Sequence, residues 1–247
     1  MNYLVTGCAG FIGYHVADSI LKQDKQSKVI GIDNLNDYYS VKLKQKRIQL
    51  LKQNKRFNFL KINLIDKKKI IRVFKKHKID FVIHLAAQAG VRYSLINPES
   101  YYESNIVGFS NIIEISHANN VKKFIFASSS SVYGDKKRYP LNETEKIYPK
   151  NIYSASKKLN EDIASDVSKI SKMQMIGLRF FTIYGKWGRP DMLIFSFLKS
   201  AKEQKIYYLN DYGNHVRDFT HIDDVLIIIN KLIKKKINQK FQIFNIC

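Results

Sequence analysis

At 247 residues, of which 45% are hydrophobic, the chain is long enough for one large domain with a buried core, or for one domain and part of a second. Its net charge of +21 is carried mostly by lysines dispersed along the sequence, whereas nucleic-acid-binding proteins cluster Arg and aromatic residues on one face, so no nucleic-acid partner is expected. No apolar run reaches transmembrane length, and Cys8 and Cys247 have neither disulfide nor zinc spacing, so we expect no membrane span, no metal site and a cytoplasmic setting.

The first residues predict a strand, a glycine-rich turn and a helix. A short apolar run is followed by Gly7-Cys8-Ala9-Gly10-Phe11-Ile12-Gly13, after which apolar residues recur at helical spacing. Gly7 allows a sharp turn, Gly10 leaves room for a pyrophosphate against backbone N–H groups, and Gly13 lets the helix lie close to the strand. The spacing is G-x-x-G-x-x-G, and its alternative reading is an ordinary strand-to-helix turn.

A second predicted strand, over 28–33, ends in Asp33. This acid follows Gly13 by about twenty residues, the distance at which dinucleotide-binding folds place a carboxylate on the adenosine ribose. A carboxylate there hydrogen-bonds the ribose hydroxyls and repels a 2′-phosphate. The turn and the acid together therefore predict NAD, rather than NADP, as the cofactor.

Strands and helices alternate along the next part of the chain. We expect strands over 57–63, 80–85, 121–127 and 175–179, and helices over 41–51, 67–77, 101–117 and 153–170. This alternation predicts an α/β fold, a Rossmann-type doubly wound parallel sheet. The regularity loosens later, so we expect a Rossmann domain over 1–178 and a smaller, partial substrate-binding lobe over 179–247, with a helix at 222–235 that packs with the Rossmann domain.

A candidate chemical site lies in the second half of the chain. The strand over 121–127 leads into four serines, 128–131, and Tyr153 and Lys157 are four residues apart on a predicted helix, so they share a face. A nearby ammonium lowers the pKa of a tyrosine, ordinarily about 10, and so makes it a better base. Taken alone, the Tyr–Lys spacing could be chance and the serines a polar loop. Together, and after the glycine-rich turn, they predict a tyrosine base with a serine partner.

The order and spacing of these motifs resemble the extended short-chain dehydrogenase/reductase family, and within it the nucleotide-sugar epimerases of the UDP-glucuronate 4-epimerase group. The resemblance spans nearly the whole chain, and 84–94 and 177–192 are its most specific stretches. It implies an NAD-dependent enzyme that converts UDP-glucuronate to UDP-galacturonate through a 4-keto sugar. It also implies a homodimer paired through the helices at 101–117 and 153–170.

The resemblance further implies roles for individual residues, with Tyr153 as the base that takes the proton from the sugar O4. The implied catalytic residues are Ser129, Tyr153 and Lys157. The implied NAD contacts are Gly7, Gly10, Phe11, Ile12, Gly13, Asp33, Asn63, Leu85, Ala86, Ala87, Asn105, Tyr153 and Lys157. The implied substrate contacts are Ser129, Ser130, Thr182, Arg189 and Arg217, with Arg189 on the sugar carboxylate and Arg217 on the diphosphate.

The chain departs from the family pattern at several points. Asn63 stands where an adenine-contacting Asp is usual, Leu209 stands where an aromatic residue commonly meets the uracil, and family members continue beyond Cys247, so we expect a truncated lobe. Three alternatives stay open: a 4-epimerase for UDP-glucose or UDP-N-acetylhexosamine, a UDP-glucuronate decarboxylase, and a catalytically incompetent NAD-binding fragment. Ser131 replaces an acid that is typical of the decarboxylating relatives, which favours epimerisation.

Overall fold

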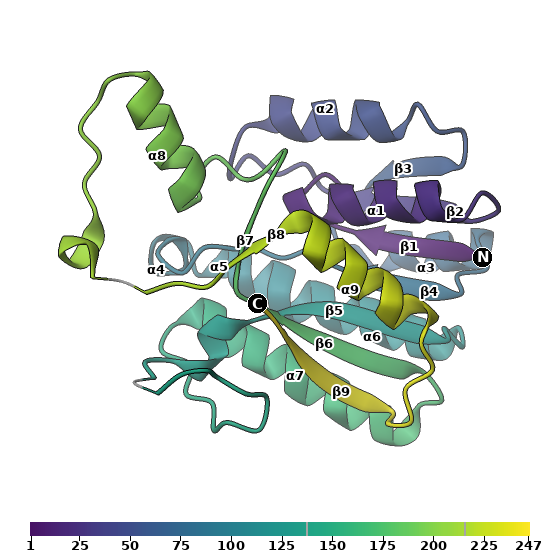
Figure 1. Ribbon diagram of the computed structural model, residues 1–247. Coiled ribbons are helices and arrows are strands. Elements are labelled where there is room, and N and C mark those ends of the chain that lie inside the picture. The colour runs from purple at the N-terminus through teal and green to yellow at the C-terminus, as the bar shows by residue number, and fades with distance from the viewer. Residues whose placement is uncertain (137, 215) are drawn as a thin grey trace.

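A seven-stranded sheet forms the centre of the computed structural model, which describes residues 1–136, 138–214 and 216–247 (Figure 1). The strand order is β3-β2-β1-β4-β5-β6-β9, and each neighbouring pair is parallel. The strands are β1 (Asn2–Thr6), β2 (Lys28–Asp33), β3 (Phe57–Lys61), β4 (Phe81–His84), β5 (Lys123–Ser129), β6 (Gln174–Phe180) and β9 (Phe241–Ile246). The order reverses between β1 and β4, where doubly wound folds bind nucleotides. The predicted fold class is confirmed.

Helices cover both faces of this sheet and form two apolar cores with it. On one face lie α1 (Phe11–Gln23), α2 (Val41–Leu51) and α9 (Ile222–Lys234), and on the other lie α3 (Lys67–Lys76), α6 (Gly108–Ala118) and α7 (Ile152–Ile170). Because both faces are covered, the strands are continuous apolar runs rather than alternating ones. Within the described ranges, no helix combines the length and the apolar character needed to cross a membrane.

The predicted helix over 101–117 is interrupted. After α4 (Tyr93–Ile96), the chain forms α5 (Glu99–Tyr101), then a π-helix, η1 (Tyr102–Val107), and only then α6. Gly108 packs against Leu64, where an added Cβ would lie 3.0 Å from the Leu64 Cβ. A helical hydrophobic pattern does not distinguish i→i+4 from i→i+5 bonding, so the sequence predicted the helix but not its wider turn.

The chain leaves the sheet after β6 and returns to it at β9. Between them lie β7 (Thr182–Tyr184) and β8 (Phe219–His221), which pair with each other, together with α8 (Leu193–Lys202) and the short 3-10 helix η3 (Asn210–Gly213). α8 contains no buried residue and stands away from the sheet (Figure 1). α9 packs on α1, and β9 is one of the two edge strands of the main sheet. The division into two lobes at residue 178 stays a prediction.

Candidate active site

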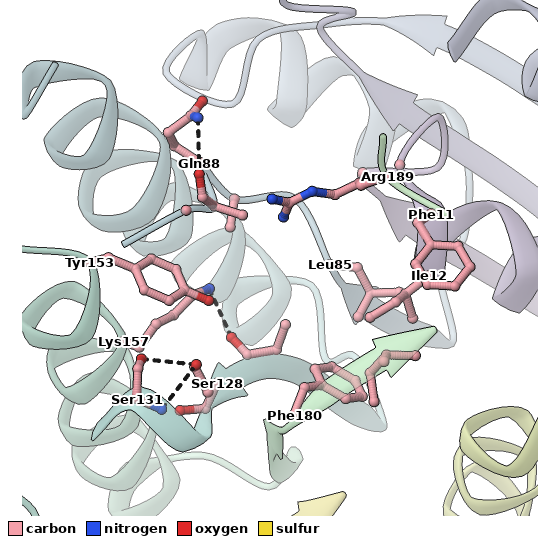
Figure 2. Close-up of a pocket in the computed structure, with 18 of the residues that line it drawn as sticks. Phe11, Ile12, Leu85, Gln88, Ser128, Ser131, Tyr153, Lys157, Phe180 and Arg189 are labelled. Atoms are coloured by element: carbon pink, nitrogen blue, oxygen red, sulfur yellow. Dashed lines mark hydrogen bonds between the residues drawn. The ribbon is translucent and has the colours of Figure 1, made fainter. Parts of the chain in front are cut away.

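A cavity of about 1200 Å³ lies at the carboxyl ends of the parallel strands (Figure 2). It is lined by most of the residues predicted from the sequence. These are Gly7, Gly10, Phe11, Ile12, Gly13, Asp33, Asn63, Leu85, Ala86, Ala87, Ser129, Ser130, Tyr153, Lys157, Thr182, Arg189 and Arg217. The fold thus brings the residues predicted for a cofactor and those predicted for a sugar into one continuous space.

The glycine-rich turn has the shape of a phosphate cradle. Gly7 has φ +72°, and a Cβ added there would lie 2.6 Å from the backbone nitrogen of Ala86. A Cβ on Gly13 would lie 2.1 Å from the carbonyl oxygen of Gly7, so only glycine allows this approach of helix to strand. α1 then begins after Gly10 without a side-chain cap, which leaves backbone N–H groups for an anionic ligand. This arrangement fits the pyrophosphate of a dinucleotide.

Asp33 closes the cradle from the end of β2. Its carboxylate accepts hydrogen bonds from the backbone N–H groups of Ala9, at 3.0 Å, and Leu35, at 2.8 Å. Burial raises the pKa of Asp33, and these two bonds act in the opposite direction because they favour the carboxylate. Asp33 therefore fixes the glycine-rich turn and faces the cavity at the place expected for a ribose.

Tyr153 and Lys157 project from the first turns of α7. A capping box sets where this helix begins: the Asn151 side chain accepts from the Ser154 N–H at 2.9 Å, and the Ser154 hydroxyl accepts from the Asn151 N–H at 3.2 Å. Lys157 Nζ donates to the carbonyl oxygen of Ala127 at 2.9 Å, which joins the helix to β5 (Figure 2). Burial lowers the pKa of Lys157 to about 8.

The serine run ends β5 and turns into a short 3-10 helix, η2 (Ser130–Tyr133). The Ser129 hydroxyl oxygen accepts from the N–H of Ser131 at 3.2 Å and from its hydroxyl at 2.9 Å. Both bonds leave the Ser129 hydroxyl proton for another acceptor. The turn therefore presents a hydroxyl donor on the same side of the cavity as Tyr153.

Burial is the main influence on the pKa of Tyr153 and raises it, while the Ser129 hydroxyl and the positive charge of Arg189 lower it. The sequence predicted that Lys157 would do the lowering. In the structure, the charge that lowers the pKa of Tyr153 is that of Arg189. The role of Lys157 in tuning Tyr153 stays a prediction.

The guanidinium of Arg189 is hydrogen-bonded along one edge, and its other edge faces the cavity. Nε donates to Asp191 Oδ1 at 3.0 Å, Nη2 donates to Asp191 Oδ2, and the Tyr38 hydroxyl donates to Oδ2 at 3.2 Å. The guanidinium carbon lies 5.7 Å from the centroid of the Tyr38 ring. In Figure 2 the guanidinium extends into the cavity on the side of Tyr153. Asp191 and Tyr38 thus orient a cation toward the space where a substrate would lie.

Sequence reasoning missed a buried ion pair behind the site. Arg179 on β6 donates through Nε and Nη2 to the two carboxylate oxygens of Glu161 on α7, at 2.9 and 2.8 Å, and both side chains are nearly inaccessible. Ser128 Oγ donates to Glu161 Oε1 at 2.5 Å, and the Glu161 charge raises the pKa of Lys157 against the effect of burial. Glu161 follows Lys157 by one helical turn, so its spacing was a signal that could have found it.

Asn105, predicted to contact NAD, is not among the described residues that line the cavity but lies directly behind one of them, Gln88, and its contact with the cofactor stays a prediction. Its Oδ1 accepts from the Gln88 N–H at 2.8 Å, and its Nδ2 donates to the Gln88 carbonyl at 3.1 Å and to Ser156 Oγ at 3.0 Å. Gln88 itself lines the cavity, as does Lys44, whose Nζ donates to the Asn36 carbonyl at 2.7 Å. Gln88 lies within the specific stretch 84–94, whereas Lys44 carries no local sequence signal for this role.

Comparisons with known proteins agree with this geometry. The model of the NAD dependent epimerase/dehydratase family matches residues 3–247. Protein CapI of Staphylococcus aureus is 46% identical over 237 residues, which are 95% of this chain and 70% of that protein. UDP-glucuronate 4-epimerase 4 of Arabidopsis thaliana is 43% identical over 231 residues, which are 92% of this chain and 52% of that protein.

A solved structure shares the fold. The crystal structure of UDP-glucuronic acid 4-epimerase from Bacillus cereus, in complex with UDP-glucuronic acid and NAD, has a TM-score of 0.92 and 34% identity. The match covers 100% of this chain and 77% of that one. These similarities confirm the predicted resemblance and the predicted cofactor. The chain is an enzyme that belongs to the NAD dependent epimerase/dehydratase family.

Proposed function

We propose that the protein epimerises C4 of a UDP-hexuronic acid and so interconverts UDP-glucuronate and UDP-galacturonate. The observation that carries this proposal is the oriented guanidinium of Arg189, which faces the same cavity as the tyrosine base. A cation in that place matches a sugar carboxylate. Relatives named UDP-glucuronate 4-epimerase, such as the Arabidopsis protein, support the same substrate.

In the proposed reaction, Tyr153 takes the proton from the sugar O4 while Ser129 hydrogen-bonds the same oxygen. NAD, when bound, accepts the hydride from C4 and later returns it, so no external oxidant or reductant is consumed. Lys157 would hold the nicotinamide ribose from its position on α7. The 4-keto sugar then turns over, takes the hydride on its other face, and recovers its proton from Tyr153.

Arg189, Thr182 and Ser130 would hold the carboxylate, and Arg217 would pair with the diphosphate, where a guanidinium binds two oxygens at once. The position of the carboxylate matters because a 4-keto uronate is a β-keto acid. It loses carbon dioxide when the bond to its carboxylate aligns with the carbonyl π system. A guanidinium fixed by Asp191 can hold the carboxylate out of that alignment, which favours epimerisation over decarboxylation.

We predict that the purified protein converts UDP-glucuronate to UDP-galacturonate without added reductant and without release of carbon dioxide. Chromatography of the nucleotide sugars, with trapping of labelled carbon dioxide, measures both. Arg189→Ala should weaken uronate binding and allow some pentose product. If the parent protein makes mainly UDP-pentose, the decarboxylase alternative holds instead. If it converts UDP-glucose and not UDP-glucuronate, the neutral-sugar alternative holds.

We also propose a cytoplasmic homodimer paired through η1, α6 and α7. Apolar side chains are exposed on η1, on α7 and on α4, which contacts α7: Leu95 and Ile96 are 76% and 78% exposed, and Tyr102, Val107 and Leu159 are also exposed. A second copy of the chain would cover them.

We predict that light scattering at micromolar concentration gives twice the chain mass, and that Val107→Lys shifts the protein to monomer. Ile227→Lys, a change of equal chemistry on the exposed side of α9, should leave the mass unchanged. A parent protein that stays monomeric at every concentration would contradict this interface.

A further inference from the structure

Arg47 is a fully buried cation outside the cavity lining. It lies on α2 with no exposed surface. Among the residues that the structure describes, no carboxylate lies within ion-pair distance of it, although Asp33 is near enough for the charge of Arg47 to act against the rise in its pKa. Burying a guanidinium without a direct ion pair is unfavourable unless its donors are satisfied, and among the described residues Nε of Arg47 has no hydrogen-bond partner. A position that retains this side chain therefore calls for a physical reason.

The donors of Arg47 join two loops that are far apart in the sequence. Nη1 donates to the carbonyl oxygen of Ala9, at 2.8 Å, inside the glycine-rich turn, and to the Tyr39 hydroxyl at 2.7 Å. Nη2 donates to the carbonyl oxygens of Trp187 and, at 3.3 Å, Gly188. A single planar group therefore links the phosphate cradle to the residues that directly precede Arg189.

The second of these loops needs external support. Trp187 has φ +59°, a left-handed conformation that is unfavourable for a bulky side chain, and Gly185 has φ +141°. The indole of Trp187 packs edge-on against Tyr14 of α1. The carbonyl groups that this backbone turns toward α2 are the ones that Arg47 binds. Without Arg47 these carbonyl groups would lose the guanidinium donor that the structure gives them.

We propose that Arg47 is a positioning residue that locks the loop carrying Arg189 to the glycine-rich turn, and so fixes the carboxylate-binding guanidinium relative to the cofactor site. The identity of the bound carboxylate rests on the proposed function, whereas the link between the two loops does not. Lysine cannot substitute, because a single ammonium lacks the fork that spans oxygens on both loops.

The test is a double-mutant cycle on the NAD-loaded enzyme, with dissociation constants measured by calorimetry for UDP-glucuronate and for UDP, which lacks the carboxylate. Arg47→Lys should raise the dissociation constant of UDP-glucuronate about tenfold and that of UDP less than about twofold. In the Arg189→Ala background, Arg47→Lys should raise the dissociation constant of UDP-glucuronate less than about twofold, because the guanidinium that Arg47 positions is absent.

Arg56→Lys is the matched control. Arg56 also donates to backbone carbonyls, those of Leu21, Asp24 and Ser27, at the opposite end of the sheet, and its replacement should leave both dissociation constants unchanged. The inference fails if Arg47→Lys weakens the binding of UDP as much as the binding of UDP-glucuronate. It also fails if the effects of Arg47→Lys and Arg189→Ala on the binding free energy of UDP-glucuronate are additive.

A second readout separates this inference from the proposed function. The Gly188 N–H donates to the Gly185 carbonyl at 3.1 Å within the supported loop. In Arg47→Lys this amide should exchange with deuterium at least about tenfold faster than in the parent, whichever sugar the enzyme accepts. If the parent does not bind UDP-glucuronate, the proposed function fails while this measurement still decides the role of Arg47. An unchanged exchange rate would overturn it.

Discussion

Replacing Tyr153 by Phe is expected to lower kcat by about 10²–10⁴-fold and to leave the dissociation constant of NAD nearly unchanged. The substitution removes the hydroxyl that exchanges a proton with the sugar O4. The ring, which meets the ring of Tyr101 edge-on with centroids 6.1 Å apart, stays in place. Lys157 keeps its bond to the Ala127 carbonyl, so the wall of the cofactor site is preserved. Steady-state rates with UDP-glucuronate and calorimetry with NAD measure the two quantities.

Tyr3→Phe provides the control for loss of a buried phenol. Tyr3 is 5% exposed and lies in β1 near its amino end, away from the cavity, so its replacement should leave kcat unchanged. If Tyr153→Phe retains full activity, another group is the base and the proposed mechanism is wrong. If it loses NAD binding in the same proportion as activity, the hydroxyl serves the cofactor rather than the chemistry.

Replacing Arg179 by Met is expected to destabilise the fold by about 3–5 kcal/mol. Glu161 would then be a buried carboxylate with the Ser128 hydroxyl as its remaining side-chain partner, since the Arg179 bonds at 2.9 and 2.8 Å are lost. Arg179 also donates to the Tyr133 hydroxyl at 2.8 Å, so the turn after β5 would lose support as well. Urea unfolding with linear extrapolation gives the free energy of unfolding for each variant.

Two further variants separate loss of the charge pair from loss of packing. Glu161→Leu combined with Arg179→Met should recover most of the stability, because no uncompensated charge remains. Lys169→Met, in an exposed pair whose side chains are 70% and 73% accessible, should cost less than about 1 kcal/mol. A cost below about 1 kcal/mol for Arg179→Met would show that the buried pair does not stabilise the fold.

Local patterns were enough to predict the sheet and most of the cavity. The glycine-rich turn, Asp33 and the Tyr153–Lys157 spacing each depend on neighbours in the chain, and a parallel sheet aligns the carboxyl ends of its strands. The fold class and the NAD cofactor followed from these features. The structure places each of these residues on the cavity wall.

What the sequence did not reveal depends on contacts between distant segments. Arg47 donates to the carbonyl groups of Trp187 and Gly188, which are 140 and 141 residues away in the sequence. No local sequence pattern indicates such a partner. The pKa of Lys157 depends chiefly on burial, which only the packed structure supplies. The position of β9 next to β6 is equally non-local, because strand order is set by which elements cover each face.

The return of the chain to the sheet at β9 bears on how this family can diversify. β6 and β9 pair over Met175–Phe180 and Phe241–Ile246, so both ends of the intervening excursion are fixed. The closure entropy of such an excursion grows only with the logarithm of its length, at about 0.6 kcal/mol for each doubling. The stretch around α8, which buries no side chain, can therefore gain or lose residues over evolution at little cost to the sheet. Changes in this stretch can adapt the enzyme to a new sugar, while the cofactor-binding and catalytic residues at the strand ends are inherited unchanged.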